Sequence, residues 1–110
     1  MSVVNWNQKL LATFGDYLSP ESSLSWEQAK RGHPPGTRVE GRVIIHAPFG
    51  AWIDLKMGFP ALLEIIVIEG LTPERYREDD YCPVGSCVEA TISHYVDSRR
   101  QIYLKQTEWP

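Results

Sequence analysis

Two aromatic side chains, Phe49 and Trp52, are the residues whose type and spacing point most directly to binding chemistry. Ala51, Ile53 and Leu55 follow the alternation of an apolar inner strand face, which leaves Trp52 pointing outward, with Phe49 beside it at the preceding corner. Burial of one large aromatic side chain contributes about 1.5 to 3 kcal/mol, so two rings on the water side of a sheet require a reason. We therefore predict that they form an exposed surface for a ligand.

The histidines and cysteines form no pattern that predicts catalysis or a metal site. His33, His46 and His94 belong to different predicted elements, and the sequence has no glycine-rich phosphate loop and no nucleophile motif between a strand and a helix. Cys82 and Cys87 lack the further Cys or His ligands nearby that zinc needs, and we interpret them as a reduced pair. The sequence therefore predicts no enzyme activity, no cofactor and no metal.

Length and composition fit one globular domain. With 110 residues, of which 43% are hydrophobic and 23% charged, the chain is long enough for one core and too short for two domains. No apolar run is long enough to span a membrane, and the amino terminus lacks a basic head followed by an apolar block. We therefore expect a cytoplasmic protein that does not contact membranes.

The formal net charge of −3 is confined to one segment, the acidic connector formed by residues 67–81. This connector carries five acidic and two basic side chains, whereas the acidic and basic residues before and after it balance. Nucleic-acid binders usually carry a basic excess, so any affinity for phosphate must come from local placement of arginines. The acidic connector is also a candidate surface for steering a protein partner.

The first 34 residues are predicted to be a helical extension. Apolar residues recur at spacings of three and four from Val3 to Leu18, which is typical of one amphipathic helix that ends before Ser19. We expect this apolar stripe to pack against one end of the sheet, or alternatively to present Trp6 to a protein partner.

A second, shorter helix is predicted from residue 25 to residue 32. Ser25 and Gln28 have the spacing of a capping box, in which the two side chains satisfy free backbone groups of the first turn. Gly32 is predicted to end the helix in a left-handed conformation.

From residue 35 onward, short segments with one apolar face alternate with turn signals. The five predicted strands are residues 39–46, 51–55, 61–63, 87–95 and 101–105. The first strand is predicted to place Val39, Gly41, Val43 and Ile45 on the inner face of the barrel. The fourth strand is predicted to place Val88, Ala90 and Ile92 there, and His94 continues this alternation and is expected to pack near the barrel wall. Such strands indicate a closed or nearly closed barrel, because closure removes unpaired edges.

Several short motifs follow one another between residues 35 and 105. They are Pro-Gly-x-x-Val-x-Gly-x-Val at 35–43, Phe-Gly-Ala-Trp-Ile-Asp-Leu at 49–55, Ala-Leu-Leu-Glu-Ile at 61–65, Pro-Val-Gly at 83–85, Val-Asp at 96–97 and Ile-Tyr-Leu at 102–104. In this order and spacing the set resembles the S-one domain, the RNA-binding repeat of the ribosomal S-one protein.

The resemblance implies a mainly β fold, namely a five-stranded antiparallel barrel of the oligonucleotide and oligosaccharide-binding (OB) type at residues 35–110, preceded by the helical extension at residues 1–34. It also implies that single-stranded RNA binds one face of the barrel, where Phe49 and Trp52 stand at the family's two stacking positions. Stacking uses the flat face that every base has and contributes about 1 to 3 kcal/mol per base with little sequence preference.

Further residues are predicted to contact RNA. Arg42, Arg99 and Arg100 are expected to contact phosphates and so to compensate for the family's usual arginine, whose position is occupied here by Gln101. His46 is expected either to touch a nucleotide or to be a surface residue at the end of its strand. Asp97 is expected to hold an arginine or a base edge, unless it is an ordinary turn residue that bonds its own backbone.

Two departures from the family pattern leave a second interpretation open. Glu64 stands where many members have a base-contacting histidine, and Gln101 stands where an arginine is usual. Because a carboxylate repels phosphate, the chain could instead be a protein-interaction module that keeps the barrel and uses the same aromatic rings as anchors. Basic side chains around Phe49 and Trp52 favour RNA, whereas Glu64 and Asp54 beside them favour a protein.

Overall fold

The computed structural model of the chain describes residues 6–47, 49–68 and 83–106. Val3, Cys82 and the acidic connector from residue 69 onward lie outside the described residues, so the predictions that rest on them stay predictions. Cys87 is described and its thiol is exposed.

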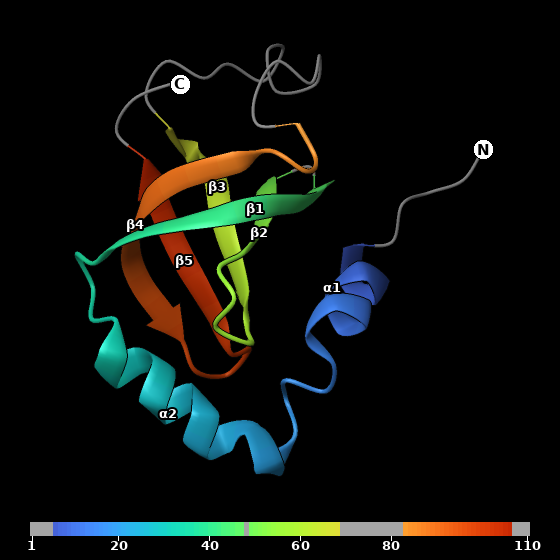
Figure 1. The fold of residues 1–110 in the computed structure, drawn as a ribbon, viewed down its shortest axis with the longest axis vertical. Coiled ribbons are helices and arrows are strands. Elements are labelled where there is room, and N and C mark those ends of the chain that lie inside the picture. The colour runs from blue at the N-terminus through green and yellow to red at the C-terminus, as the bar shows by residue number, and fades with distance from the viewer. Residues whose placement is uncertain (1–5, 48, 69–82, 107–110) are drawn as a thin grey trace.

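Five strands form one closed barrel in the order β1-β2-β3-β5-β4 (Figure 1). They are β1 (Arg38–Ala47), β2 (Gly50–Asp54), β3 (Pro60–Ile68), β4 (Cys87–Val96) and β5 (Gln101–Gln106). Neighbouring strands are antiparallel except β3 and β5, which are parallel. A ring of five strands cannot alternate direction throughout, because five is odd. The predicted barrel is confirmed, and this parallel pair is the one difference from the predicted antiparallel pairing.

Two layers of side chains, matched across the strands, fill the barrel. One layer is Val43, Ile53, Ala61 and Ile102, and the other is Ala51, Leu63, Leu104 and Ile92. Each of these side chains is at most 2% exposed. Directly paired residues on neighbouring strands point to the same side of the sheet, so both layers face inward. The core of the barrel is therefore built from the strand pattern that the sequence predicts.

Two register shifts change which side chains face outward. One lies in β1 just before Ile45, and the other lies in β4 just before His94. An extra residue on one strand reverses the inward and outward alternation beyond it. Ile45 consequently pairs with Trp52 on the outer side of the sheet. It belongs to the hydrophobic core as predicted, at 9% exposed, but the prediction that it continues the inner face of the barrel is wrong. His94 pairs with Tyr103 and is exposed. The prediction that His94 continues the inner face and packs near the barrel wall is therefore also wrong.

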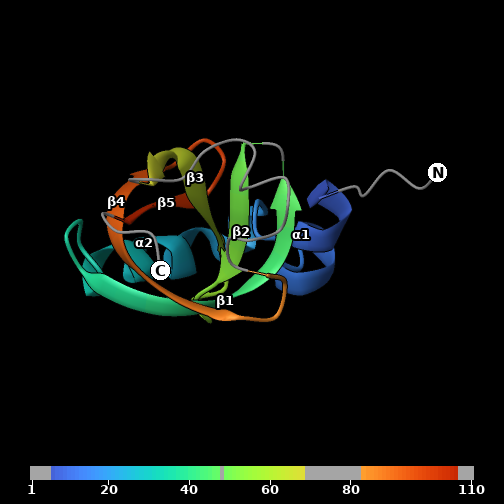
Figure 2. The same ribbon diagram turned by 90° about the horizontal axis from the view of Figure 1, so that it is seen from above.

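Two helices from the extension pack on the outside of the barrel (Figures 1 and 2). The first, α1 (Trp6–Phe14), lies beside the strands β1 and β2. After the single 3-10 turn η1 (Pro20–Ser22), α2 (Ser23–Gly32) runs across the end of the barrel at which β4 turns into β5. Leu10 and Trp26 are 0% and 3% exposed, so both helices contribute to the same hydrophobic core as the strands.

The helix ends differ from their predicted positions. Gly15 has a φ of +70° and ends α1 before the predicted residue 18. The predicted start at Ser25 is wrong, because η1 leads directly into α2 and makes Ser22 its N-cap, without a side-chain capping bond. Gly32 is the last residue of α2 as predicted, but it does not adopt the predicted left-handed conformation. Neither described helix is long and apolar enough to cross a membrane.

Candidate nucleic-acid interface

A row of five directly paired side chains crosses the outer face of the barrel. It consists of Ile45, Trp52, Leu62, Tyr103 and His94, which come from β1, β2, β3, β5 and β4 in turn. In OB folds, ligands bind over the second and third strands and between the loops that join strands 1 to 2 and 4 to 5. These loops here are residues 48–49 and 97–100. The row therefore lies on the predicted binding face.

The helix α1 covers the Trp52 end of this row. The ring of Trp6 stacks on that of Trp52, with 5.3 Å between centroids and 25° between planes. Phe49 meets both rings edge-on, at 5.3 Å from Trp6 and 6.1 Å from Trp52. Trp52 is 1% exposed, whereas Phe49 is 38% exposed. The prediction of an exposed ring is correct for Phe49 and wrong for Trp52, because Trp6 covers the face of Trp52.

One feature of the sequence, other than alternation, indicates that the outer face beneath Trp6 is buried. Ala61, Leu62 and Leu63 follow one another without a polar residue, and each is at most 2% exposed. A strand covered on both faces reads as a continuous apolar run. The run therefore indicated that other residues pack on the outer face of β3. Trp6, from the apolar stripe of the first helix, packs on this outer face against Trp52.

Next to Trp6, the outer face contains an open pocket of about 500 Å³. Its walls include the aromatic rings of Trp6, Phe49 and Tyr103, and its polar lining includes Glu64 and Arg99. A pocket of about 300 to 1,000 Å³ with apolar walls and a few polar groups is typical of sites for small ligands. The structure therefore leaves a ligand-sized part of the binding face open.

Of the seven residues predicted to contact RNA, Phe49, Trp52 and Arg99 line this pocket. Arg42 lies at the other end of the β1–β2 pair, opposite Asp54, and its Nη1 donates to the backbone oxygen of Gly85 at 2.6 Å. His46 is half-buried on β1. Neither Arg42 nor His46 belongs to the pocket lining.

Arg100 holds the segment between α1 and η1. Its Nη1 donates to the backbone oxygens of Tyr17, at 3.1 Å, and of Ser19, at 2.5 Å. Its own backbone is left-handed, with a φ of 48°. The guanidinium is thus occupied by carbonyl oxygens of the extension, where the sequence predicted a phosphate contact.

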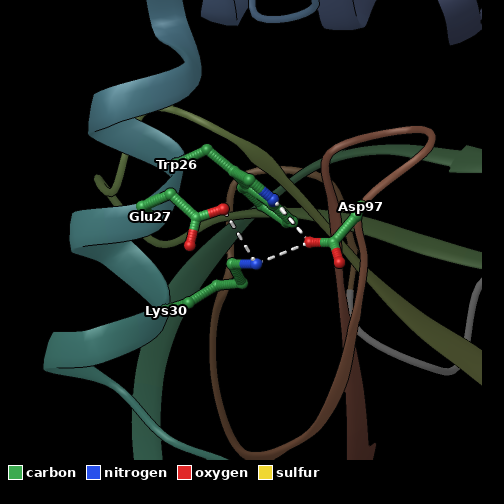
Figure 3. Close-up of polar contacts among 4 residues, drawn as sticks. All are labelled: Trp26, Glu27, Lys30 and Asp97. Carbon is green, nitrogen blue, oxygen red and sulfur yellow. Dashed lines mark hydrogen bonds and ion pairs between the residues drawn. The ribbon is translucent and has the colours of Figure 1, made fainter.

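Asp97 binds α2 (Figure 3). The Nε1 of Trp26 donates to Asp97 Oδ1 at 2.8 Å, and the Nζ of Lys30 donates to the same oxygen at 2.7 Å. Lys30 also forms an ion pair with Glu27 at 3.2 Å. Asp97 therefore holds a tryptophan and a lysine, whereas the sequence predicted an arginine, a base edge or its own backbone.

Comparison with known proteins agrees with this fold. Over 48 residues, which are 44% of this chain, the sequence is 35% identical to the small ribosomal subunit protein bS1 of Chlamydia trachomatis. The barrel has the fold of an S-one domain. The matched part spans 8% of the length of that ribosomal protein, and no family model matches the chain.

Solved structures show the same S-one fold at low sequence identity. GSP13 from Bacillus subtilis superposes with a TM-score of 0.54 and 21% identity, covering 64% of this chain and 53% of that chain. RNase R from Mycoplasma genitalium, in complex with ribose methylated single-stranded RNA, gives a TM-score of 0.58 and 16% identity, covering 74% of this chain and 14% of that chain.

The polar contacts between α2 and the S-one barrel shift two pKa values. The pKa of Asp97 is held below its ordinary value, chiefly by the hydrogen bond from Lys30 and next by the one from Trp26. The pKa of Lys30 is raised, chiefly by its hydrogen bond to Asp97. The side chain of Asp97 is 71% exposed, so solvent screening keeps the contribution of this pair small.

We expect Asp97→Asn to destabilise the protein by up to about 1 kcal/mol at neutral pH, because it removes the ion pair with Lys30. A carboxyl whose pKa is lowered by folding stabilises the fold above the pKa of the unfolded chain, about 4, and this effect is lost as the pH falls through the lowered value. Urea unfolding of both proteins from neutral to acidic pH should show the difference shrinking below about pH 4. A difference independent of pH would contradict the ion pair.

Proposed function

We propose that this chain is a non-catalytic RNA-binding module that holds single-stranded RNA in the pocket beside α1. The observation that carries the proposal is the set of aromatic walls, with Arg99 among the lining residues, on the ligand face of an S-one barrel. The likeness to a ribosomal protein and to a nuclease solved with single-stranded RNA supports it. In this proposal residues 35–110 form the binding domain, and the extension at residues 1–34 completes its pocket.

The aromatic contacts differ from those that the sequence predicted. Phe49 keeps its role as a stacking ring, because it is partly exposed and lines the pocket. Trp52 does not stack on a base in this proposal. Its ring packs against the ring of Trp6, and Trp6 forms an aromatic wall of the pocket instead. Asp97 and Arg100 have no RNA contact in this proposal, because their side chains hold the extension.

Charge limits how strongly RNA can bind. Arg99 is the arginine of the pocket lining, and Arg42 and His46 would meet only RNA that continues along β1. For a single strand, each neutralised phosphate makes the slope of the logarithm of the binding constant against the logarithm of the salt concentration steeper by about 0.7. We therefore expect modest affinity that falls only slightly with added salt.

The test is binding of fluorescein-labelled single-stranded RNA, measured by anisotropy at low and raised salt. Phe49→Leu should weaken binding about tenfold, because it removes one stacking surface. Arg99→Ala should weaken binding and make it less dependent on salt, since one phosphate contact is lost. Arg38→Ala is the matched control, because Arg38 is exposed outside the pocket and pairs with Glu89 at 3.0 Å.

Two results would contradict the proposal. The first is an unaltered protein that binds no single-stranded RNA at micromolar concentration. The second is equal loss of affinity in Arg99→Ala and Arg38→Ala together with unchanged binding by Phe49→Leu, which would indicate attraction by net charge alone.

A protein-interaction module is the second candidate, and the extension supplies the observation that favours it. Leu11, Leu18 and Leu24 are 51%, 51% and 65% exposed. Such apolar side chains can anchor a protein partner. In the RNA proposal, replacing Leu11 and Leu24 together by serine should leave RNA affinity unchanged, because neither residue lines the pocket. A loss of RNA binding in that variant would contradict the proposed site, because it would show that Leu11 and Leu24, which lie outside the pocket, take part in binding.

A further inference from the structure

We propose that the pocket beside α1 selects guanine, through the carboxylate of Glu64. This inference rests on the proposed RNA binding and adds the base that the pocket accepts. It assigns a role to the acidic residue that otherwise argues against nucleic acid at this face.

The position of Glu64 follows from the close approach of β2 and β3. Gly50 pairs with Glu64, and a Cβ on Gly50 would lie 2.4 Å from the backbone oxygen of Leu63 and 3.0 Å from Glu64 Cα. Because Phe49 directly precedes Gly50, the carboxylate and the exposed ring belong to one corner of the pocket. A base stacked on Phe49 therefore has Glu64 near its edge.

Glu64 is an acceptor that is available to a ligand. No other described side chain forms an ion pair or a hydrogen bond with its carboxylate. Gln101, a buried polar group of the same lining, already has a polar neighbour: burial raises the pKa of the Tyr17 hydroxyl, and the Gln101 side chain partly offsets this rise. The oxygens of Glu64 therefore determine which hydrogen-bonding groups the pocket favours.

Charge orients the nucleotide in the pocket. A carboxylate repels a phosphate and attracts hydrogen-bond donors, whereas the guanidinium of Arg99 attracts phosphate. Both groups line the same pocket, so the base enters toward Glu64 and the backbone stays toward Arg99.

Only guanine presents two adjacent donors on its Watson–Crick edge, the N1–H and the 2-amino group. A carboxylate has two acceptor oxygens and no donor, so it can accept both hydrogen bonds at once. Adenine and cytosine place a ring nitrogen acceptor beside their amino group, and uracil has one N–H between two carbonyl oxygens. Each of these places a lone pair against the carboxylate, which is why guanine is favoured.

The test compares short uridine oligomers that carry one guanosine, inosine, 1-methylguanosine or adenosine. The guanosine oligomer should bind at least about tenfold more tightly than the adenosine oligomer, as for other bidentate base contacts. Inosine lacks the 2-amino group and should be intermediate, and 1-methylguanosine should bind no better than adenosine.

Glu64→Gln should remove most of the difference between guanosine and adenosine. Glu40→Gln is the matched control, because Glu40 is exposed on β1 outside the pocket and the change in net charge is the same. The loss of one negative charge should raise affinity slightly in both variants, except that Glu64→Gln should bind the guanosine oligomer more weakly, so the ratio between bases is the decisive quantity.

The outcomes separate this inference from the function on which it rests. Equal binding of all oligomers, with the same ratios in Glu64→Gln and in the unaltered protein, would overturn guanine selection and leave RNA binding intact. A complete lack of binding by every oligomer would overturn RNA binding itself, and guanine selection with it.

Discussion

Trp52→Ala is expected to lower the free energy of unfolding by about 3 to 5 kcal/mol. Trp52 is 1% exposed and packs between the barrel and α1, so its removal leaves a cavity and takes away the ring on which Trp6 stacks. Since whole domains are stable by only about 5 to 15 kcal/mol, the loss should be visible as a large shift of the urea midpoint. Circular dichroism measured against urea concentration checks this.

Phe49→Ala is the matched control from the same corner. Phe49 is 38% exposed, so its replacement should cost clearly less stability than that of Trp52 while it removes a stacking surface. If Trp52→Ala unfolded at the same urea concentration as the unaltered protein, Trp52 would be the exposed ring that alternation predicts. Because Trp52→Ala is expected to be much less stable, a loss of RNA binding in this variant would not show that Trp52 contacts RNA. Trp52→Phe, which keeps a buried ring, is the variant for binding measurements.

Trp26→Ala is expected to have an effect of similar size, about 3 to 5 kcal/mol. Trp26 is 3% exposed and meets Phe59 and Tyr95 edge-on, at 5.0 and 5.4 Å between centroids. Its removal takes away the buried side chain by which α2 joins the core. Thermal unfolding should show the loss of stability, and faster amide hydrogen exchange in α2 should show that the helix detaches.

Two further variants separate packing from hydrogen bonding at Trp26. Trp26→Phe keeps an aromatic ring and loses the bond to Asp97, which is exposed and can bond water, so we expect a cost of about 1 kcal/mol beyond the change in ring size. Leu24→Ala, on the same helix and 65% exposed, should change stability by no more than about 0.5 kcal/mol. A full loss of stability in Trp26→Phe would mean that the hydrogen bond dominates.

The extension packs on the face of the barrel on which OB folds bind their ligands. Three residues that were predicted to contact RNA, namely Trp52, Asp97 and Arg100, instead contact Trp6, α2 and the segment before η1. What remains for a ligand is the part of the face beside Trp6. The face on which OB folds bind their ligands is thus partly covered here by a segment that precedes the barrel in the chain.

The sequence by itself determined the closed barrel, Phe49 as an exposed ring and the five strands, except that β3 continues from the predicted residue 63 to Ile68. These follow from local causes, because alternation, turn residues and short apolar faces each act within a few neighbours. The helix ends were less predictable, since η1 runs into α2 and a single left-handed glycine, Gly15, stops α1.

Only the tertiary structure decided the burial of Trp52, the outward turn of Ile45 and His94, and the partners of Asp97 and Arg100. The register shifts in β1 and β4 reverse an alternation that the sequence shows as unbroken. The cover over Trp52 comes from Trp6, whose stacking partner depends on how the extension folds back onto the barrel. A pattern along one strand records which faces are apolar, but it cannot say whether an outer face meets water or another part of the chain, because that depends on residues distant in sequence.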